Sequence, residues 1–225
     1  MLTPTASSLP GRPALLALVL MLPLALALAG GALAAPKSIR LPEPQTTGGK
    51  PLMQVLKERR TARDFKGDPL PPQTLSNLLW AAFGVNRPAS GGRTAPSAHD
   101  VQEIDVYVVL PDGAYLYDAR GNALELVRAG DLRGLTGMQP FVKDAPVSLV
   151  YVSDYRKFTR DSEADKAFYS AADAGHISQN VYLFGASEGL AVMVRAYIDK
   201  PALAKALGLK PYQHIVLAQS VGYPK

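Results

Sequence analysis

Apolar residues recur along this chain with two different periods, one typical of helices and the other typical of strands. Steps of three and four residues predict four helices, at about 51–60, 72–83, 166–188 and 201–207. Short runs of β-branched and aromatic residues predict strands at 103–110, 114–118, 123–127, 146–153, 190–196 and 214–223. The first three strands are separated by Pro111-Asp112-Gly113 and Arg120-Gly121-Asn122, which predict tight turns and therefore an antiparallel meander.

The order of these elements predicts an α+β fold, with an antiparallel-rich central sheet flanked by helices. A segment rich in Gly, Pro and Ser, residues 86–102, interrupts the regular pattern between the second helix and the first strand. Loops of this length are uncommon in compact domains unless they have a function. We therefore expect residues 86–102 to contribute to a site.

The first 34 residues have the pattern of a signal peptide. Arg12 precedes an apolar stretch from Ala14 to Ala29, and Ala32-Leu33-Ala34 supplies a small-x-small cleavage site. We predict cleavage after Ala34 and export to the periplasm or the medium, followed by a linker at 35–50 and one domain at 51–225. The alternative is an uncleaved membrane anchor, because the apolar stretch is only slightly shorter than the roughly 20 residues that span a bilayer.

Composition and charge exclude several classes of function. The chain has no cysteine, so a disulfide framework and a cysteine-based metal site are both excluded. Its formal net charge is +5, and its Lys and Arg residues are spread along the chain except at 57–63, which does not suit nucleic-acid binding. His99, His176 and His214 lack the spacing of a zinc site, and His176 is expected in the core. A local anion site fits this composition better than a polyanion groove.

The most concentrated charge lies in Arg59-Arg60-Thr61-Ala62-Arg63, at the end of the first predicted helix. One interpretation is a solvated helix end, where cations interact favourably with the negative end of the helix dipole. The other is a phosphate site, because a guanidinium offers that group a planar fork of donors. The segment alone leaves both interpretations open.

Three blocks of sequence together resemble the nitroreductase family of flavin enzymes, over nearly all of residues 51–225. RRTARDF at 59–65 is similar to the opening arginine motif of that family, and APSAHDVQEIDVYVV at 95–109 is similar to its Pro-Ser loop and following strand. DAGHISQNVYLFGASEGLAVMVRA at 173–196 resembles its central helix and next strand. LLWAAFGVNRPASGGRTAPSA at 78–98 is also similar to the branch that includes azoline-oxidising dehydrogenases.

The resemblance implies FMN bound without a covalent link at the interface of a homodimer. Arg59 would pair with the FMN phosphate, Thr61 would add a hydroxyl donor, and Arg63 would lie near the pyrimidine end of the flavin. The residues expected to approach the ring from the partner subunit are Pro96, Ser97 and Ala98. Gln102 occupies the glutamine position of the same motif. Asp100 replaces an asparagine common in relatives, which removes a hydrogen-bond donor and adds negative charge.

The resemblance also implies contacts at the other end of the flavin and around its phosphate. The backbone of Arg195 and Ala196 would lie beside N5 and O4, and Gln139 would contact the pyrimidine ring. Relatives commonly complete the phosphate site with a basic residue after the last strand, for which Lys225 is the candidate and Arg60 the alternative. We expect no catalytic side chain and no metal, because the flavin carries the chemistry.

Two functions of different class follow from the resemblance. The first is an FMN-dependent oxidoreductase that passes electrons from a reduced nicotinamide, or another donor, through flavin N5 to a small electrophile such as a nitroaromatic or a quinone. The alternative is an exported flavin-binding protein with little or no turnover, since NAD(P)H is scarce outside the cytoplasm. An azoline-type dehydrogenase would reverse the electron flow, but its additional Lys-Tyr residues have no secure counterpart here.

Overall fold

The structure is a computed structural model that describes residues 37–225. The signal peptide predicted for residues 1–34, and its alternative as a membrane anchor, lie outside the described residues. Within residues 37–225, no helix combines the length and the apolar character that crossing a membrane requires.

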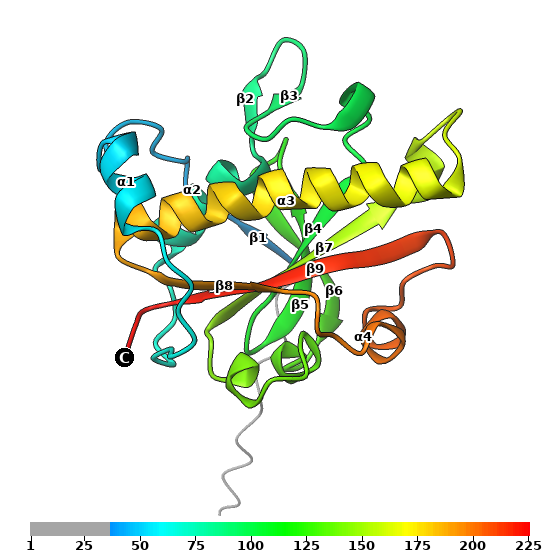
Figure 1. Ribbon diagram of the computed structural model, residues 1–225. Coiled ribbons are helices and arrows are strands. Elements are labelled where there is room, and N and C mark those ends of the chain that lie inside the picture. The colour runs from blue at the N-terminus through cyan, green and yellow to red at the C-terminus, as the bar shows by residue number, and fades with distance from the viewer. Residues whose placement is uncertain (1–36) are drawn as a thin grey trace, which may run out of the picture. The chain divides into compact units, whose positions relative to one another are not determined.

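A seven-stranded sheet forms the centre of the domain, and every neighbouring pair of strands in it is antiparallel (Figure 1). The strand order is β1-β6-β5-β4-β7-β9-β8. The strands are β1 (Ser38–Arg40), β4 (Ile104–Val109), β5 (Gly113–Asp118), β6 (Ala123–Ala129), β7 (Val147–Asp154), β8 (Ala191–Arg195) and β9 (Gln213–Gly222). A separate hairpin pairs β2 (Val85–Arg87) with β3 (Gly92–Arg93). The predicted meander is confirmed as β4-β5-β6, and the α+β class is confirmed with it.

The α-helices also match the predicted pattern. They are α1 (Leu52–Glu58), α2 (Pro72–Phe83), α3 (Glu163–Glu188) and α4 (Lys200–Leu207). Short 3-10 helices occur at η1 (Ala98–Asp100), η2 (Arg133–Leu135), η3 (Pro140–Lys143) and η4 (Tyr155–Lys157). The long helix α3 begins three residues earlier than predicted, because Ser162 and Asp165 form a capping box at its N-terminus.

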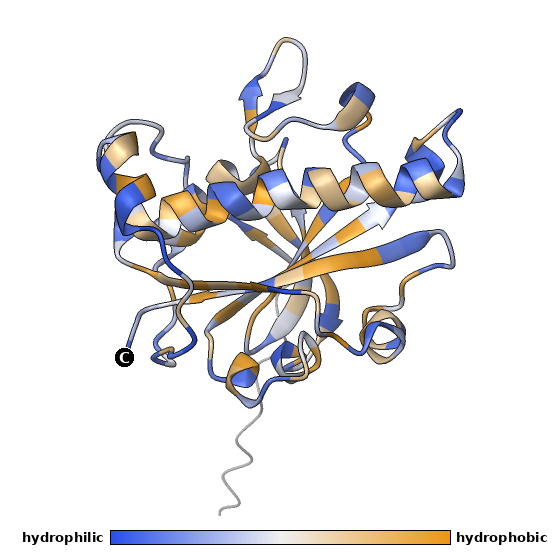
Figure 2. Cartoon of the chain, in the orientation of Figure 1, coloured by the Kyte–Doolittle hydropathy of each residue, from blue (hydrophilic) through white to orange (hydrophobic). Residues whose placement is uncertain are grey.

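Both faces of the sheet are covered, since alternate residues of its central strands belong to two different apolar clusters. Val106 and Val108 of β4 pack in the cluster that includes α2 and α3, whereas Tyr107 and Val109 pack in the one that includes Leu203 of α4. Figure 1 shows α3 crossing one side of the sheet and α4 on the other. In Figure 2 the hydrophobic colours concentrate on the strands. The result is a three-layer domain whose strand β7 is buried along its whole length.

Part of the segment predicted as a linker at 35–50 belongs to the domain. Residues 38–40 form β1, which pairs with β6, and Leu41 is buried in the main core. A strand of three residues is too short to show a periodic pattern, so the sequence did not reveal it. The domain therefore begins before Pro51.

The buried face of α3 also differs from the predicted one. Apolar residues at steps of three and four along this helix predict a buried stripe that begins with Ala167 and Ala171 and continues through Ile177. Ala167 and Ala171 are instead exposed, whereas Ser170 and Asp173 are buried. His176, expected in the core, is exposed. The helix buries polar residues at this end because they have polar partners: Ser170 bonds Ser153 of β7, and Asp173 accepts from Ala98 N of the loop.

Candidate functional site

The arginine segment 59–63 runs along the edge strand β8. Ala62 N donates to the carbonyl oxygen of Val192 (3.0 Å), and Lys66 N donates to that of Tyr223 (2.9 Å). Phe65, which is fully buried, anchors the segment from below against Phe141, with 6.3 Å between ring centroids. Backbone bonds and one apolar anchor fix the segment, so its arginine side chains are not needed to hold it.

A cleft of about 460 Å³ lies between this segment, the C-terminal turns of α3 and the start of β8. This volume is within the range of small-molecule sites. Its charged and aromatic lining residues are Lys50, Lys57, Glu58, Arg59, Arg60 and Tyr182. The guanidinium carbon of Arg59 lies 5.2 Å from the centroid of the Tyr182 ring, a cation-π contact that orients the arginine.

The cleft carries an excess of positive charge. Lys50 forms an ion pair with Glu58 (2.7 Å), and this hydrogen bond lowers the pKa of Glu58. Among residues 37–225, no carboxylate forms an ion pair with Lys57, Arg59 or Arg60. Three uncompensated cations around one cleft favour an anionic ligand.

The structure places the other predicted phosphate-end residues around the same segment. Thr61 Oγ1 is 3.0 Å from the Tyr182 hydroxyl, which in turn accepts a hydrogen bond from Val194 N (2.9 Å). Lys225 N donates to the carbonyl oxygen of Asp64 (3.4 Å), so the last residue lies beside the arginines. Arg63 is exposed and does not belong to the cleft lining, so its predicted contact with the pyrimidine end stays a prediction.

The far end of β8 brings Arg195 and Ala196 beside the segment that holds Gln139. Arg195 is buried and donates from Nε to the Thr136 carbonyl oxygen (2.9 Å), while Met138 N donates to that of Tyr197 (3.0 Å). Gln139 Oε1 is buried and has no hydrogen-bond partner among the described residues. Buried polar atoms are rarely left unpaired, so this oxygen is available to an N–H donor of a ligand.

The loop at 96–102 has an unusual backbone. His99, Asp100 and Gln102 have φ of 54°, 53° and 52°, in the left-handed region that favours glycine. Gln102 accepts from Arg93 Nε (2.9 Å) and donates from Nε2 to Asp100 Oδ1 (3.0 Å). Gln102 and Asp100 therefore stabilise the loop itself, and their expected contacts with a flavin stay predictions.

Within one chain the structure separates the loop from the arginine segment. Asp173 of α3 accepts from Ala98 N of the loop, whereas Tyr182 of α3 contacts Arg59 and Thr61. These two positions are nine residues apart on the helix, which corresponds to about 14 Å. Figure 1 agrees, with the loop above α3 and the arginine segment below it, beside the C-terminus. The predicted residues thus form two half-sites.

Sequence reasoning missed several residues that the structure brings to these half-sites. Lys50 and Lys57 line the cleft, Tyr182 joins the arginine segment to β8, and Glu103 and Asp173 contact the loop. One signal was available: Asp173 lies four residues before Ile177, on the face of α3 that the apolar stripe marks as buried. An acid at such a position indicates a polar partner.

Fold and site together define a class: an α+β protein whose antiparallel sheet carries a cationic cleft on its edge strand. The profile of the nitroreductase family matches residues 56–223. A curated relative from Methanocaldococcus jannaschii, provisionally named a nitroreductase, is 32% identical over an alignment of 178 positions that covers 74% of this chain and 88% of the relative. The chain therefore belongs to the nitroreductase family, a family of oxidoreductases.

Solved structures agree with this assignment. A crystal structure from Ralstonia eutropha JMP134, also provisionally named a nitroreductase, is 44% identical with a TM-score of 0.81, over 84% of this chain and 90% of that one. A second, from Desulfovibrio desulfuricans in complex with FMN, is 19% identical with a TM-score of 0.57, over 79% of this chain and 88% of that one. The second shares the fold, and the fold class predicted from the sequence is confirmed.

Proposed function

We propose that this protein is an FMN-dependent oxidoreductase that binds the FMN phosphate in the cationic cleft. The observation that carries the proposal is the set of uncompensated cations Lys57, Arg59 and Arg60 in one cleft on the edge strand. A phosphate dianion placed there gains charge-assisted hydrogen bonds, of which the guanidinium of Arg59 offers the most directional. The FMN complex of the Desulfovibrio protein, which has the same fold, supports this choice of ligand.

The residues at the other end of β8 fit a flavin ring. The unpaired Oε1 of Gln139 can accept the N3–H of a pyrimidine, and the exposed backbone at Ala196 offers further polar contacts. Arg195 places a buried positive charge on the same segment. When bound, FMN would supply hydride and electron transfer, while these residues would orient the ring and stabilise negative charge on it.

We further propose that the protein is a homodimer in which each loop 96–102 completes the cleft of the partner subunit. Within one chain the two half-sites are about 14 Å apart along α3 and lie on opposite sides of that helix (Figure 1), so the loop of the same chain does not face its own cleft. In addition, Leu52 and Met53 of α1 are 61% and 76% exposed in the single chain. Large exposed apolar side chains of this kind indicate a contact surface.

A visible absorption spectrum of the purified protein, before and after addition of FMN, tests the proposal. We expect a bound flavin band and a released cofactor that comigrates with FMN. Arg59→Ala should weaken FMN binding by about 10- to 100-fold, the value of one or two charge-assisted hydrogen bonds. Arg160→Ala, at an exposed arginine before α3, is the matched control and should bind like the wild type. A protein that takes up no FMN would contradict the proposal.

The electron donor and acceptor define a second test. We propose a reduced nicotinamide as donor and a small electrophile, a nitroaromatic or a quinone, as acceptor. Anaerobic NAD(P)H should bleach the flavin band, and addition of the acceptor should restore it. If FMN binds but NAD(P)H does not reduce it, whereas dithionite does, the alternative of an exported flavin-binding protein is favoured. Fractionation of cells that express the full chain tests the proposed export, which rests on residues 1–34.

A further inference from the structure

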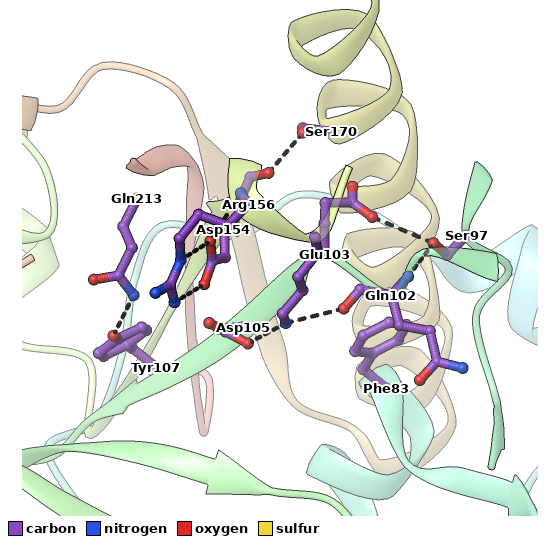
Figure 3. Close-up of polar contacts among 12 residues, drawn as sticks. Phe83, Ser97, Gln102, Glu103, Asp105, Tyr107, Asp154, Arg156, Ser170 and Gln213 are labelled. Carbon is purple, nitrogen blue, oxygen red and sulfur yellow. Dashed lines mark hydrogen bonds and ion pairs between the residues drawn. The ribbon is translucent and has the colours of Figure 1, made fainter. Parts of the chain in front are cut away.

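Two buried carboxyl groups lie beneath the loop 96–102. Glu103, which follows the loop, has no exposed surface, and Asp173 on α3 is 3% exposed. Glu103 Oε2 accepts a hydrogen bond from Ser97 Oγ (3.2 Å), as Figure 3 shows, and Asp173 Oδ2 accepts one from Ala98 N (2.8 Å). Acids from two different elements therefore hold consecutive residues of the loop.

The two carboxyl groups also interact with each other. The negative charge of Asp173 acts on Glu103, and Glu103 Oε1 is buried without a hydrogen-bond partner among residues 37–225. Burial, opposed by a backbone hydrogen bond and reinforced by the charge of Asp173, raises the pKa of Glu103 to about 7. A proton on Glu103 supplies the missing bond, because a neutral carboxyl can donate to a carboxylate.

Little positive charge is available to this pair. Its one ion-pair contact within the described residues is to His176, whose Nδ1 is 3.7 Å from Asp173 Oδ1. The nearby cations have other partners, since Arg156 pairs with Asp154 (2.6 Å) and Lys157 pairs with Asp105 (2.8 Å). Titratable or charged groups on the segments next to the pair are Arg93 of β3, His99 and Asp100 of the loop, Tyr169 and His176 of α3, Asp105 of β4, and Asp154, Tyr155, Arg156 and Lys157 of β7 and η4.

The loop needs such support, because its backbone is strained. Each of the three non-glycine residues with positive φ, His99, Asp100 and Gln102, costs on the order of 1 kcal/mol and persists only when its surroundings determine it. Ser97 Oγ is central to that support. It accepts from Gln102 N (2.7 Å) and donates to Glu103 Oε2, so it links both ends of the strained turn to the buried acid (Figure 3).

We propose that Glu103 and Asp173 are positioning residues, which share one proton and thereby hold the loop 96–102 in the conformation that completes the flavin site. This inference rests on the proposed function. With both groups ionised, two buried negative charges act on each other with His176, 3.7 Å from Asp173, as their one ion-pair contact within the described residues, and this state is disfavoured. Relief requires one carboxylate to turn towards solvent, which takes the acceptor away from Ser97 Oγ or Ala98 N. The loop then loosens, and FMN binds less tightly.

The test measures FMN affinity against pH for the wild type and for Glu103→Gln, in which the amide imitates the protonated acid. Because the phosphate of FMN itself titrates near pH 6, the two proteins are compared at each pH from 6 to 9. We expect equal affinities at pH 6. Above pH 7 the dissociation constant of the wild type should rise relative to Glu103→Gln, by up to about tenfold per pH unit, as expected for uptake of one proton.

Glu163→Gln, at an exposed acid in the first turn of α3, is the matched control and should follow the wild type. Amide hydrogen exchange of residues 97–103 in the FMN-free proteins gives an independent measurement. Corrected for the intrinsic pH dependence, exchange should accelerate above pH 7 in the wild type only. Parallel pH profiles of wild type and Glu103→Gln in both measurements would overturn the inference. Failure of the proposed function would appear differently, as no FMN binding by the wild type at any pH.

Discussion

At the scale of single residues, Glu103 links the pH of the solution to the stability of the fold. A carboxyl whose pKa is raised to about 7 in the native state has its ordinary value near 4.5 in the unfolded chain. Between these values the native state binds more protons than the unfolded state, so the free energy of unfolding falls as pH rises. The contribution is complete below pH 4.5 and is lost by the time pH has risen through about 7.

We predict that Glu103→Gln removes this dependence. The amide cannot ionise, so at pH 8 the variant should be more stable than the wild type by about 1–3 kcal/mol. Urea unfolding of both proteins at pH 5, 6.5 and 8 measures the difference, and the other titrating groups cancel in the comparison. If the difference in the free energy of unfolding between the variant and the wild type were the same at pH 8 as at pH 5, Glu103 would not be protonated in the fold.

Arg195 is a second buried ionisable residue, but it keeps its charge. Burial lowers its pKa to about 10, a cost of about 3 kcal/mol to the charged form. Against this cost stand hydrogen bonds from its guanidinium to the Thr136 carbonyl oxygen, to Thr136 Oγ1 (2.6 Å) and to Ser220 Oγ (2.9 Å). Bonds from a charged donor contribute about 1.5–3 kcal/mol each, so the balance favours the arginine.

We therefore predict that Arg195→Met destabilises the protein by about 1–3 kcal/mol, because it leaves several buried oxygens without a donor. Arg195→Lys should recover only part of this loss, since an ammonium cannot reproduce the planar fork that reaches all three acceptors. Thermal or urea unfolding measures both. Arg160→Met, at an exposed arginine without an ion pair among the described residues, is the control and should change stability by less than about 0.5 kcal/mol.

At the scale of elements, the contact of α3 with β8 depends on the absence of a side chain at Gly185. A Cβ at this position would collide with Val192 Cγ2, and Val192 is a stiff, buried residue of the strand that lines the cleft. Gly175 lies ten residues earlier on the same helix, and a Cβ there would meet no atom within 4 Å. The two glycines form a natural pair of test sites.

Gly185→Ala should destabilise the fold by about 1–2 kcal/mol, because overpacking of about 1–3 kcal/mol outweighs the gain in helix propensity. It should also weaken FMN binding, since α3 and β8 are walls of the same cleft. Gly175→Ala should instead stabilise the helix by up to about 1 kcal/mol. If urea unfolding showed equal effects at the two positions, the packing of α3 on β8 would not be the cause.

At the scale of the whole molecule, the arginine segment 59–63 and the loop 96–102 of one chain lie on opposite sides of α3, and we propose that each is half of a flavin site (Figure 1). In a symmetric dimer, each of the two sites would combine the arginine segment of one chain with the loop of the other. A substitution that disables the arginine segment, or one that disables the loop, then abolishes both sites when both chains carry it. A heterodimer with one damaged segment and one damaged loop, on different chains, retains one intact site.

This arrangement predicts complementation between two deficient proteins. Arg59→Ala removes a phosphate contact, and Ala98→Phe fills the space that the loop leaves for the ring. Each homodimer should bind little FMN, whereas a heterodimer isolated through two different affinity tags should bind roughly half as much as the wild type. Absorbance of bound flavin per protein gives the stoichiometry. A heterodimer without flavin would place both half-sites of one cofactor in the same chain.

Periodicity located the helices and strands of this domain well, because each period is a property of a few consecutive residues. The arginine motif and the Pro-Ser loop could also be identified from the sequence. Both are defined by the types of a few consecutive residues, arginines in one case and glycines and prolines in the other. The pattern failed where the structure depends on distant partners. It could not reveal β1, which exists only because β6 offers three residues to pair with.

The sequence by itself determined the order of the elements, the α+β class and the residue types available for a phosphate. Only the tertiary structure decided which of these residues meet. It placed Glu103 and Asp173 near each other although they are far apart in the chain. It placed Ala98 beside Asp173 of α3 and Arg59 beside Tyr182, farther along the same helix. The physical reason is that burial, charge and hydrogen-bond partners arise from neighbours in space, which no local period encodes.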